Sequence, residues 1–477
     1  MKIGVISLGC AKNQVDTERM LGLLRRFGYD FTPDPAEAEV LIVNTCGFID
    51  PAKEESIHAI LEMAQYKDRG RCRVLVATGC LTERYRQELR AELPEIDILL
   101  GVREYVKLPG LLAEKLGLPL PKSGCGLTER YRQELKTELP EIDILLGVRE
   151  YEKLPSLLAE KLGGPLPRLS CGLGDRLLTT PPYRAFLRTG DGCNNRCTYC
   201  AIPLIRGNLV SEPMEELIDE AKVLADRGVT ELTVIAQDTS GYGVDRYGRS
   251  MLVPLLKELN GVDALHWVRV LYTYPDTVNE ELLDTLAQGE KLIPYLDIPL
   301  QHIDDEILKR IHRRGSGAYI RSLLDYLYKN YPDFTLRTTM MVGFPGETDQ
   351  QFDALLTFLR DYPFDRVGAF AFSPEEGTKA AEMPDQVPEE IKQARLAALM
   401  AQQKPISLGR NQRWVGRETE LLIEELTRTH AIGRTPREAP DVDGRVTIPR
   451  KSYHAIGDYE PIRLTAAGEY DMKGESL

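Results

Sequence analysis

The stretch GDGCNNRCTYCAIP (Gly190–Pro203) gathers three of the chain's nine cysteines into the spacing C-x3-C-x2-C. The three are Cys193, Cys197 and Cys200, and polar residues stand between them. Structural zinc closes a tetrahedron with four ligands, so this loop would suit zinc only with a distant histidine as the fourth. An iron-sulfur cluster bound by three cysteines leaves one iron open to a small molecule. The loop therefore favours an iron-sulfur cluster, with zinc as the alternative.

Three further cysteines each lie at or just after the end of a β-like run. Cys10 follows KIGVISL, Cys46 ends VLIVNTC and Cys80 ends RVLVATGC. The carboxyl ends of parallel strands share one edge of an open sheet, so these thiols are expected to converge although they are far apart in sequence. The alternative is that they are separate core thiols. The remaining cysteines, which are expected not to be ligands, are Cys72, Cys125 and Cys171.

The N-terminal part of the chain is expected to be an α/β domain. Residues 1–178 begin with alternating strand-like and helix-like runs, which predict a parallel sheet. Within this domain the segment 81–121 returns at 127–167 with five differences in 41 positions. A solenoid needs at least three stacked units, so the pattern indicates a tandem duplication. The sequence leaves open which copy occupies the sheet.

Two more domains are expected after the duplication. Residues 179–404 contain about six strand-like runs separated by helical segments, which predict a partial (βα) barrel that works at the carboxyl ends of its strands. Residues 405–477 show short alternating runs with Gly and Asp turns, which predict a small antiparallel β-barrel of OB-like size. The fold class is therefore expected to be α/β with a small C-terminal β-barrel.

Composition and charge narrow the class of protein. The 477 residues are 43% hydrophobic and include no run of about 18 apolar residues that would suit a membrane span. The chain begins with a β-like run rather than a secretory signal, so a cytoplasmic location is expected. The net charge is -13, and residues 405–477 carry 11 Lys and Arg against 12 Asp and Glu. This balance weighs against an extended nucleic-acid-binding face.

The cysteine loop resembles the signature of the radical S-adenosylmethionine superfamily, in which an aromatic residue precedes the last cysteine of C-x3-C-x2-C. The resemblance implies a [4Fe-4S] cluster on Cys193, Cys197 and Cys200, with S-adenosylmethionine bound at the open iron. It also implies that Tyr199 lies against the adenine. In this superfamily an electron from the cluster cleaves S-adenosylmethionine to a 5′-deoxyadenosyl radical, and the barrel shields that chemistry.

Nearly the whole chain, apart from the extra copy, resembles the methylthiotransferases. The motifs SLGCAKNQVDTE, NTCGFI and ATGC carry this resemblance in the N-terminal domain. It implies that Cys10, Cys46 and Cys80 hold an auxiliary [4Fe-4S] cluster, the second of two, that carries or donates sulfur. It also implies a TRAM-like C-terminal barrel, an external electron donor such as flavodoxin or ferredoxin, a sulfur source and no membrane partner.

Within this family the chain is most similar to the branch that methylthiolates the β-carbon of an aspartate in small-subunit ribosomal protein S-twelve. The motifs that carry this likeness are IAQDTSGYG (235–243), LDIPLQH (296–302), VGFPGET (342–348), FSPEEGT (372–378) and GRTPREAPDVDG (433–444). The nearest alternative enzyme is a methylthiotransferase that acts on tRNA adenosine. A different class of alternative is an iron-sulfur carrier without catalysis.

Besides Tyr199, four residues outside the cysteines are expected to contact the cofactor, and none is assigned a catalytic acid or base role. They are Gln237, Gly343, Gly346 and Glu347. Each has a structural alternative: Gln237 could cap the next helix, and GFPGE could be a simple turn. Glu347 could pair with Arg337 or with a charged group of the cofactor. His302 could orient a substrate carboxylate or be a structural histidine.

Overall fold

A computed structural model of the chain describes residues 1–118 and 176–477. The second copy of the duplicated segment, 127–167, and the two cysteines Cys125 and Cys171 lie outside the described residues. Contacts between residues divide the chain into two units. The first comprises Met1–Gly9, Asp16–Cys46 and Glu55–Leu177, and the second comprises Cys10–Val15, Gly47–Glu54 and Leu178–Leu477.

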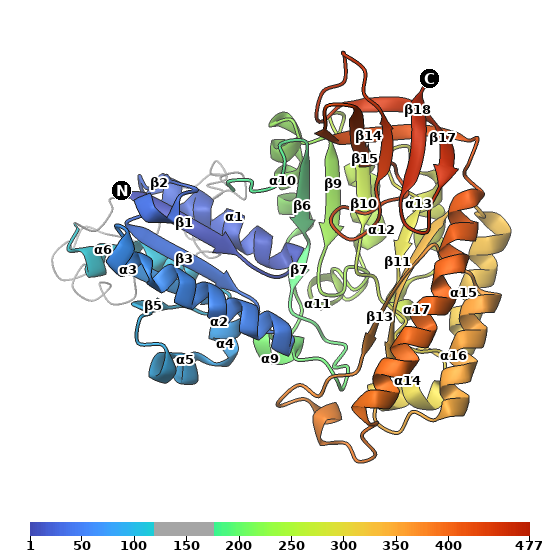
Figure 1. Ribbon diagram of the computed structural model, residues 1–477, viewed down its shortest axis with the longest axis horizontal. Helices are drawn as coiled ribbons and strands as arrows, with labels where there is room; N and C mark the ends of the chain where they lie inside the picture. Colours follow the sequence, from blue (N-terminus) through green and yellow to red (C-terminus); the bar gives the residue numbers. More distant parts are fainter. Residues whose placement is uncertain (119–175) are drawn as a thin grey trace, which may run out of the picture. The chain divides into compact units, whose positions relative to one another are not determined.

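The first unit is built on a parallel sheet with the strand order β2-β1-β3-β4-β5 (Figure 1). Its strands are β1 (Lys2–Ser7), β2 (Asp30–Phe31), β3 (Val40–Thr45), β4 (Val74–Gly79) and β5 (Ile98–Leu99). The helices of this part of the chain are α1 (Ala11–Arg26), α2 (Asp50–Ala64), α3 (Tyr66–Arg69), α4 (Cys80–Arg84), α5 (Arg86–Glu92) and α6 (Leu108–Leu116). The predicted parallel sheet is confirmed.

Both faces of this sheet are covered. Hydrophobic side chains of α1 and α6 pack on one face of β3 and β4, and those of α2 pack on the other. Every residue of β3 and β4 is buried, as expected for central strands of a parallel sheet with helices on both sides. This is why the two strands read as continuous apolar runs.

The first copy of the duplicated segment occupies the edge of the sheet. It supplies α5, β5 and α6, and β5 pairs with β4 through Val76 and Ile98. Leu108 and Leu112 of α6 are fully buried in the core on one face of the sheet. The first copy is therefore an integral part of the N-terminal domain, which answers the question that the sequence left open.

The second unit contains an open barrel of six parallel strands, each with its helices on the outer side (Figure 1). Two three-stranded sheets, β10-β9-β6 and β11-β12-β13, are joined where Val268 bonds to the backbone of Lys291 and Ile293. In the part of the chain that the structure describes, β6 and β13 do not pair, so the barrel stays open. The strands are β6 (Arg184–Arg188), β9 (Glu231–Ile235), β10 (Trp267–Val270), β11 (Tyr295–Asp297), β12 (Thr335–Val342) and β13 (Arg366–Ala371).

The helices of the second unit follow the strands in the order that a (βα) barrel requires. They are α9 (Ile202–Ile205), α10 (Met214–Asp226), α11 (Val244–Tyr247), α12 (Leu252–Asn260), α13 (Glu280–Gln288), α14 (Asp305–Ile311), α15 (Gly317–Asn330), α16 (Asp349–Asp361) and α17 (Glu389–Gln412). A short hairpin of β7 (Gly190–Asp191) and β8 (Val210–Ser211) interrupts the first βα unit.

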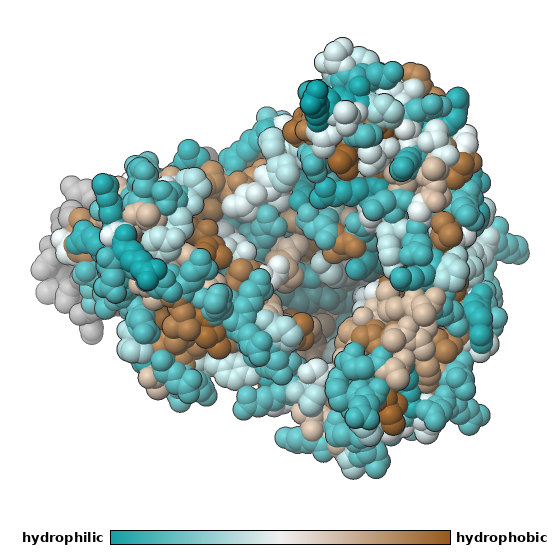
Figure 2. All heavy atoms as spheres, in the orientation of Figure 1, coloured by the Kyte–Doolittle hydropathy of each residue, from teal (hydrophilic) through white to brown (hydrophobic). Residues whose placement is uncertain are grey.

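The chain ends in a closed five-stranded barrel with the order β14-β15-β16-β18-β17. Its strands are β14 (Glu418–Leu426), β15 (His430–Arg434), β16 (Val446–Pro449), β17 (Tyr459–Ala467) and β18 (Met472–Ser476). The strand pairs are antiparallel as predicted, except that β16 and β18 are parallel. The face of this barrel seen in Figure 2 is mostly hydrophilic.

The loop between β15 and β16 fills the amino-terminal end of the six-stranded barrel. Arg434 Nη1 donates to Glu231 Oε1, the first residue of β9, over 3.0 Å. Arg269 of β10 donates to the Pro436 carbonyl oxygen over 2.9 Å, and Tyr295 of β11 donates to Asp443 over 2.6 Å. The motif GRTPREAPDVDG thus closes the end of the barrel opposite to the carboxyl ends of its strands.

Candidate metal centre

The three clustered cysteines lie in the loop of the β7–β8 hairpin, at the carboxyl end of β6. Gly192 opens this loop with a φ of +78°, and a Cβ at that position would overlap the backbone carbonyl of Asn208. Only glycine adopts this positive φ readily and also leaves room for the opposite side of the hairpin. The hairpin closes the base of the loop, where the Cys193 amide donates to the Gly207 carbonyl oxygen over 3.1 Å.

The far side of the loop is bonded to neighbouring elements of the barrel. The Thr198 amide donates to the carbonyl oxygen of Ile311 at the end of α14 over 2.9 Å. The side-chain amide of Asn195 donates to Asp238 over 2.7 Å, and Asp238 also accepts from the amide of Gly241. Asp238 therefore joins the cysteine loop to the turn after β9, which explains its place in the motif IAQDTSGYG.

The three thiols are close enough to affect one another's ionisation. Burial raises the pKa of Cys193 to about 11, and Cys197 adds to the rise. Burial likewise raises the pKa of Cys200 to about 12, with further contributions from Cys197 and Cys193. A metal centre binds thiolates, so it would release the protons that burial holds on these sulfurs.

The donor set suits a cubane cluster. The loop offers three thiols, and a [4Fe-4S] cluster held by three thiolates keeps one iron open to a small molecule. Backbone hydrogen bonds at the base and the far side of the loop hold the segment that carries these thiols. Among the residues that the structure describes, no group of three or more His, Cys, Asp and Glu side chains is arranged to hold a single metal ion.

Tyr199 lies in a hydrophobic cluster at the carboxyl end of the barrel. Its ring packs with Met341, Phe344 and Phe372, and burial raises the pKa of its hydroxyl far above the ordinary value. Next to it, the hydroxyl of Tyr274 lies 3.6 Å from the Cys197 sulfur. The aromatic residue between the second and third cysteines therefore lies beside the loop and the residues that follow β12, and its contact with the adenine stays a prediction.

The GFPGE turn follows β12 at the same end of the barrel. Gly343 and Gly346 have φ values of +72° and +77°, so glycine is required at both positions. The carboxylate of Glu347 accepts from the Gly343 amide, from Arg395 over 2.7 Å and lies 3.2 Å from His302 Nε2. Glu347 and His302 are both fully buried in this network.

The suggested pairing of Arg337 with Glu347 is wrong. Arg337 instead binds Asp297 over 3.0 Å and lies 3.6 Å from Asp443 in the loop that closes the barrel. Arg337 belongs to the early part of β12, whereas Glu347 lies beyond the end of this strand, so the two side chains face opposite ends of the barrel.

Gln237 lies directly beyond the end of β9. Its side-chain nitrogen donates to Asp191 over 3.2 Å, and Asp191 also accepts from Arg206 over 2.9 Å. The side-chain oxygen of Gln237 is buried and has no hydrogen-bonding partner among the described residues. A buried acceptor without a donor is costly, so this oxygen suits a ligand that donates a hydrogen bond.

The N-terminal sheet brings two of the other predicted ligands to one edge. Thr45 pairs with Gly79 in the register of β3 and β4, and Cys46 and Cys80 are the next residues along these two strands. The Cys46 amide and carbonyl both bond the hydroxyl of Ser56 over 2.9 Å. Cys10 lies beyond the end of β1 in the segment Cys10–Val15, which belongs to the second unit.

Arg313 and Tyr274 lie beside the cysteine loop, and nothing in the sequence singled them out. Arg313 lies over the ring of Tyr274 at 4.4 Å and is almost fully buried. It belongs to the run IHRRGSG, whose basic composition is typical of an exposed turn. Only the tertiary structure shows that this cation is enclosed next to the thiols.

Comparison with known proteins agrees with this geometry. Family models match residues 2–101 (Uncharacterized protein family UPF0004), 187–359 (Radical SAM superfamily) and 415–477 (TRAM domain). A relative from Heliobacterium modesticaldum, named ribosomal protein uS12 methylthiotransferase RimO, is 42% identical over 100% of this chain and 95% of its own length. One of the same name from Geotalea uraniireducens is 43% identical over 99% of this chain and 98% of its own length. This chain belongs to the RimO family.

A solved structure shares the fold of the RimO family chain described here. The radical S-adenosylmethionine methyltransferase TsrM from Kitasatospora setae, with tryptophan substrate and a SAM analog bound, matches with a TM-score of 0.50. The match covers 77% of this chain and 72% of that chain at 15% identity, which shows the fold alone. In the described ranges 1–118 and 176–477, no helix has the length and apolar content needed to cross a membrane.

Proposed function

We propose that this protein adds a methylthio group to the β-carbon of an aspartate in ribosomal protein uS12, the S-twelve protein of the small subunit. The observation that carries the proposal is the three-cysteine loop at the carboxyl end of the first barrel strand, in a chain that is similar along its length to RimO proteins. Because uS12 is a ribosomal protein, the enzyme would act in the cytoplasm.

We propose that Cys193, Cys197 and Cys200 hold a [4Fe-4S] cluster with one open iron for S-adenosylmethionine. When bound, this cluster supplies the electron that splits the sulfonium of S-adenosylmethionine and so provides a radical strong enough to break an unactivated C–H bond. The protein contributes position and shielding. Met341, Phe344 and Phe372 keep water from one side of the loop, and Tyr199 packs against them.

The remaining cofactor contacts would come from two strand ends, those of β9 and β12. The unpaired side-chain oxygen of Gln237 would accept a hydrogen bond from S-adenosylmethionine. The turn at Gly343 and Gly346 would offer backbone groups at close range, since neither residue has a side chain in the way. Glu347 would hold this turn in shape, because its carboxylate already accepts from the Gly343 amide and from Arg395.

We propose that Cys10, Cys46 and Cys80 hold the second [4Fe-4S] cluster and that this cluster carries the sulfur to be inserted. The adjacent strand ends at Cys46 and Cys80 support a shared site. Residues 1–178 would then serve sulfur delivery, 179–404 radical formation and 405–477 closure of the barrel and substrate contact. The electron would come from a flavodoxin or ferredoxin, and the sulfur from a separate source of sulfide.

The test is an assay of the purified, iron-loaded enzyme with S-adenosylmethionine, a strong reductant and sulfide. Mass spectrometry of uS12 should show one methylthio group in place of one aspartate hydrogen, and tRNA given to the same enzyme should stay unmodified. Modification of tRNA adenosine with unmodified uS12 would replace the proposal by the tRNA alternative. Failure to cleave S-adenosylmethionine would favour an iron-sulfur carrier.

A second experiment tests whether the N-terminal cluster is needed for sulfur insertion but not for cleavage of S-adenosylmethionine. Cys46→Ala and Cys80→Ala should retain cleavage of S-adenosylmethionine but make no methylthiolated uS12. The matched variant is Cys72→Ala, which removes a buried thiol of the same domain whose sulfur donates to the Val74 carbonyl oxygen over 3.5 Å. It should keep both activities, and full product from Cys46→Ala would refute the assignment of the second cluster.

A further inference from the structure

A buried cation with two unpaired donors among the described residues lies next to the cysteine loop. The Arg313 side chain is 8% exposed, and its Nε and Nη1 atoms have no hydrogen-bonding partner in the part of the chain that the structure describes. Guanidinium donors that are buried and unpaired are costly. Their presence therefore points to an anionic group that belongs beside them.

The position of Arg313 is fixed from two sides. His312, the residue before it, caps α14 with a φ of +64°, and its ring lies 3.2 Å from the Arg196 carbonyl oxygen in the cysteine loop. The guanidinium itself lies 4.4 Å from the centre of the Tyr274 ring, a cation–π contact. Tyr274 is held in turn by its amide, which donates to Ser240 over 2.7 Å.

Tyr274 links this cation to a thiol of the loop. Its hydroxyl lies 3.6 Å from the Cys197 sulfur while its ring carries Arg313. The neighbouring Arg314 also reaches the loop, where it donates to the Asn195 side chain over 2.6 Å, but it is exposed and pairs with Asp276 over 2.9 Å. Arg313 is the buried one of the two cations, so water screens its charge less than that of Arg314.

The burial of Arg313 determines how strongly its charge acts on the loop. The guanidinium is enclosed on the ring of Tyr274, whose hydroxyl lies 3.6 Å from the Cys197 sulfur. Negative charge on the loop is therefore stabilised by Arg313, because water screens little in these surroundings.

We propose that Arg313, carried on the ring of Tyr274, raises the reduction potential of the cluster bound by Cys193, Cys197 and Cys200. This inference rests on the proposed function, since it needs that cluster. An oxidised cubane core has two positive charges and three thiolates bring the sum to one negative charge, so a one-electron reduction adds a second. A fixed cation nearby favours the more negative, reduced form, and so does a hydrogen bond to a ligand sulfur.

The test is a potentiometric titration of the iron-loaded, full-length enzyme without S-adenosylmethionine, followed by electron paramagnetic resonance. Titanium(III) citrate supplies the single electron that the cluster takes up. Arg313→Gln should lower the ratio of reduced to oxidised cluster at least tenfold at a fixed potential, which equals about 59 mV for a one-electron couple. Tyr274→Phe keeps the ring and should give a smaller shift in the same direction, and Arg313→Lys should lie close to the unaltered enzyme.

Two controls make the result specific. Lys309→Gln removes one positive charge from an exposed position on α14 and should leave the potential unchanged. The signal of the loop cluster is assigned by repeating the titration with Cys46→Ala and Cys80→Ala in the chain. Iron and sulfide counts on every variant confirm that the cluster is present.

Each outcome decides between the proposals. An unchanged potential in Arg313→Gln with full iron overturns the inference and leaves the proposed function intact. An unchanged potential together with at least tenfold weaker binding of S-adenosylmethionine to Arg313→Gln would also overturn the inference. Arg313 would then be a contact of the cofactor carboxylate. If Arg313→Gln loses its iron, Tyr274→Phe decides, and an unchanged potential there overturns the inference. Absence of any cluster in the unaltered enzyme would instead refute the proposed function.

Discussion

Glycines mark the two places where the backbone supports the candidate ligands. Gly192 opens the cysteine loop, and Gly79 lies directly before Cys80 with a φ of +105°. At both positions an added Cβ would overlap the opposite backbone, which belongs to Asn208 in one case and to Thr45 in the other. Neighbouring glycines with similar φ and free space around them offer matched controls.

Gly192→Ala should deprive the loop of most of its iron. The left-handed backbone alone costs an alanine about 1–2 kcal/mol, and the overlap with Asn208 adds to this and forces the hairpin apart. Gly207→Ala in the same hairpin has a φ of +73° and meets no described atom within 4 Å, so it should keep its iron. Iron content after anaerobic loading is the measurement, and equal iron in the two variants would contradict the role of Gly192.

Gly79→Ala should disturb the N-terminal site alone. A Cβ there would overlap Asn44 and Thr45 of β3, which moves Cys80 away from the strand that carries Cys46. The matched variant is Gly28→Ala, with a φ of +78° and open space among the described atoms. We expect Gly79→Ala to cleave S-adenosylmethionine but to form little methylthiolated uS12, as measured by mass spectrometry. Normal product would show that this edge is not part of the site.

At the scale of single residues, the sequence indicated which candidate ligands lie close together in the structure. Cys193, Cys197 and Cys200 share one loop, so their short spacing in the sequence already predicts that they lie close together. Arg313 could not be predicted, because it follows α14 and is covered by Tyr274, which lies 39 positions earlier in the sequence, after β10. Likewise, the partners of Arg337 and Glu347 depend on the end of the barrel that each side chain faces.

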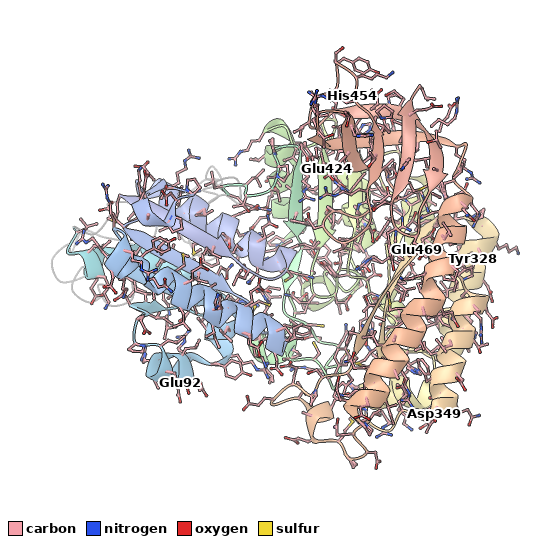
Figure 3. The ribbon with its side chains drawn as sticks, in the orientation of Figure 1. Glu92, Tyr328, Asp349, Glu424, His454 and Glu469 are labelled. Atoms are coloured by element: carbon pink, nitrogen blue, oxygen red, sulfur yellow. The ribbon has the colours of Figure 1, made fainter. Side chains whose placement is uncertain are left out.

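At the scale of elements, the β15–β16 loop holds the C-terminal barrel to the amino-terminal end of the six-stranded barrel. Arg434 is fully buried and binds both Glu231 and Glu424, and Figure 3 labels Glu424 on β14. Burial opposes the ionisation of Glu231, but Arg434 and Arg269 hold its pKa below the ordinary value. The β15–β16 loop, which we call the plug, is therefore held in the barrel by buried ion pairs rather than by hydrophobic contacts.

Arg434→Met should destabilise this junction by about 3 kcal/mol, the lower end of the range for a broken buried pair, because Arg269 still faces Glu231. The midpoint of thermal unfolding, followed by circular dichroism, is the measurement. Arg463→Met removes an exposed partner of exposed Glu418 on the same barrel and should cost less than about 1 kcal/mol. Equal shifts in the two variants would contradict the account of the plug.

Most strands could be predicted from their apolar runs, whereas the plug could not. The strands β3 and β4 are buried on both faces, so they read as continuous hydrophobic stretches. The motif GRTPREAPDVDG is polar and rich in Pro and Gly, which is typical of an exposed loop. Its burial depends on ion pairs with Glu231, Asp365 and Arg366, none of which is near it in the sequence.

At the scale of the whole molecule, the duplicated segment is the feature that the sequence could not place. Two nearly identical copies have the same preference for helix and strand, so only the structure shows that the first one forms the edge strand β5 and the helix α6. The outline of a sheet domain, an open barrel and a small closed barrel could be predicted, because each has its own period of apolar residues.

Deletion of residues 127–172 should leave the enzyme folded and iron-loaded. The deletion removes 46 residues, one repeat length, and joins Gly126 to Leu173, which reproduces the sequence order at the end of a single copy. The first copy keeps its pairing with β4, so we expect about eight irons per chain and unchanged methylthiolation. A fall to about four irons would show that the second copy is needed for one cluster.

The central claim is that the loop of three cysteines holds the cluster that supplies the electron for cleavage of S-adenosylmethionine. The most direct test is the amount of 5′-deoxyadenosine formed by the reduced enzyme, compared between the unaltered chain and Cys197→Ala. We predict steady formation by the unaltered chain and none above background by the variant. Equal formation by both, or none by the unaltered and iron-loaded chain, would contradict the account.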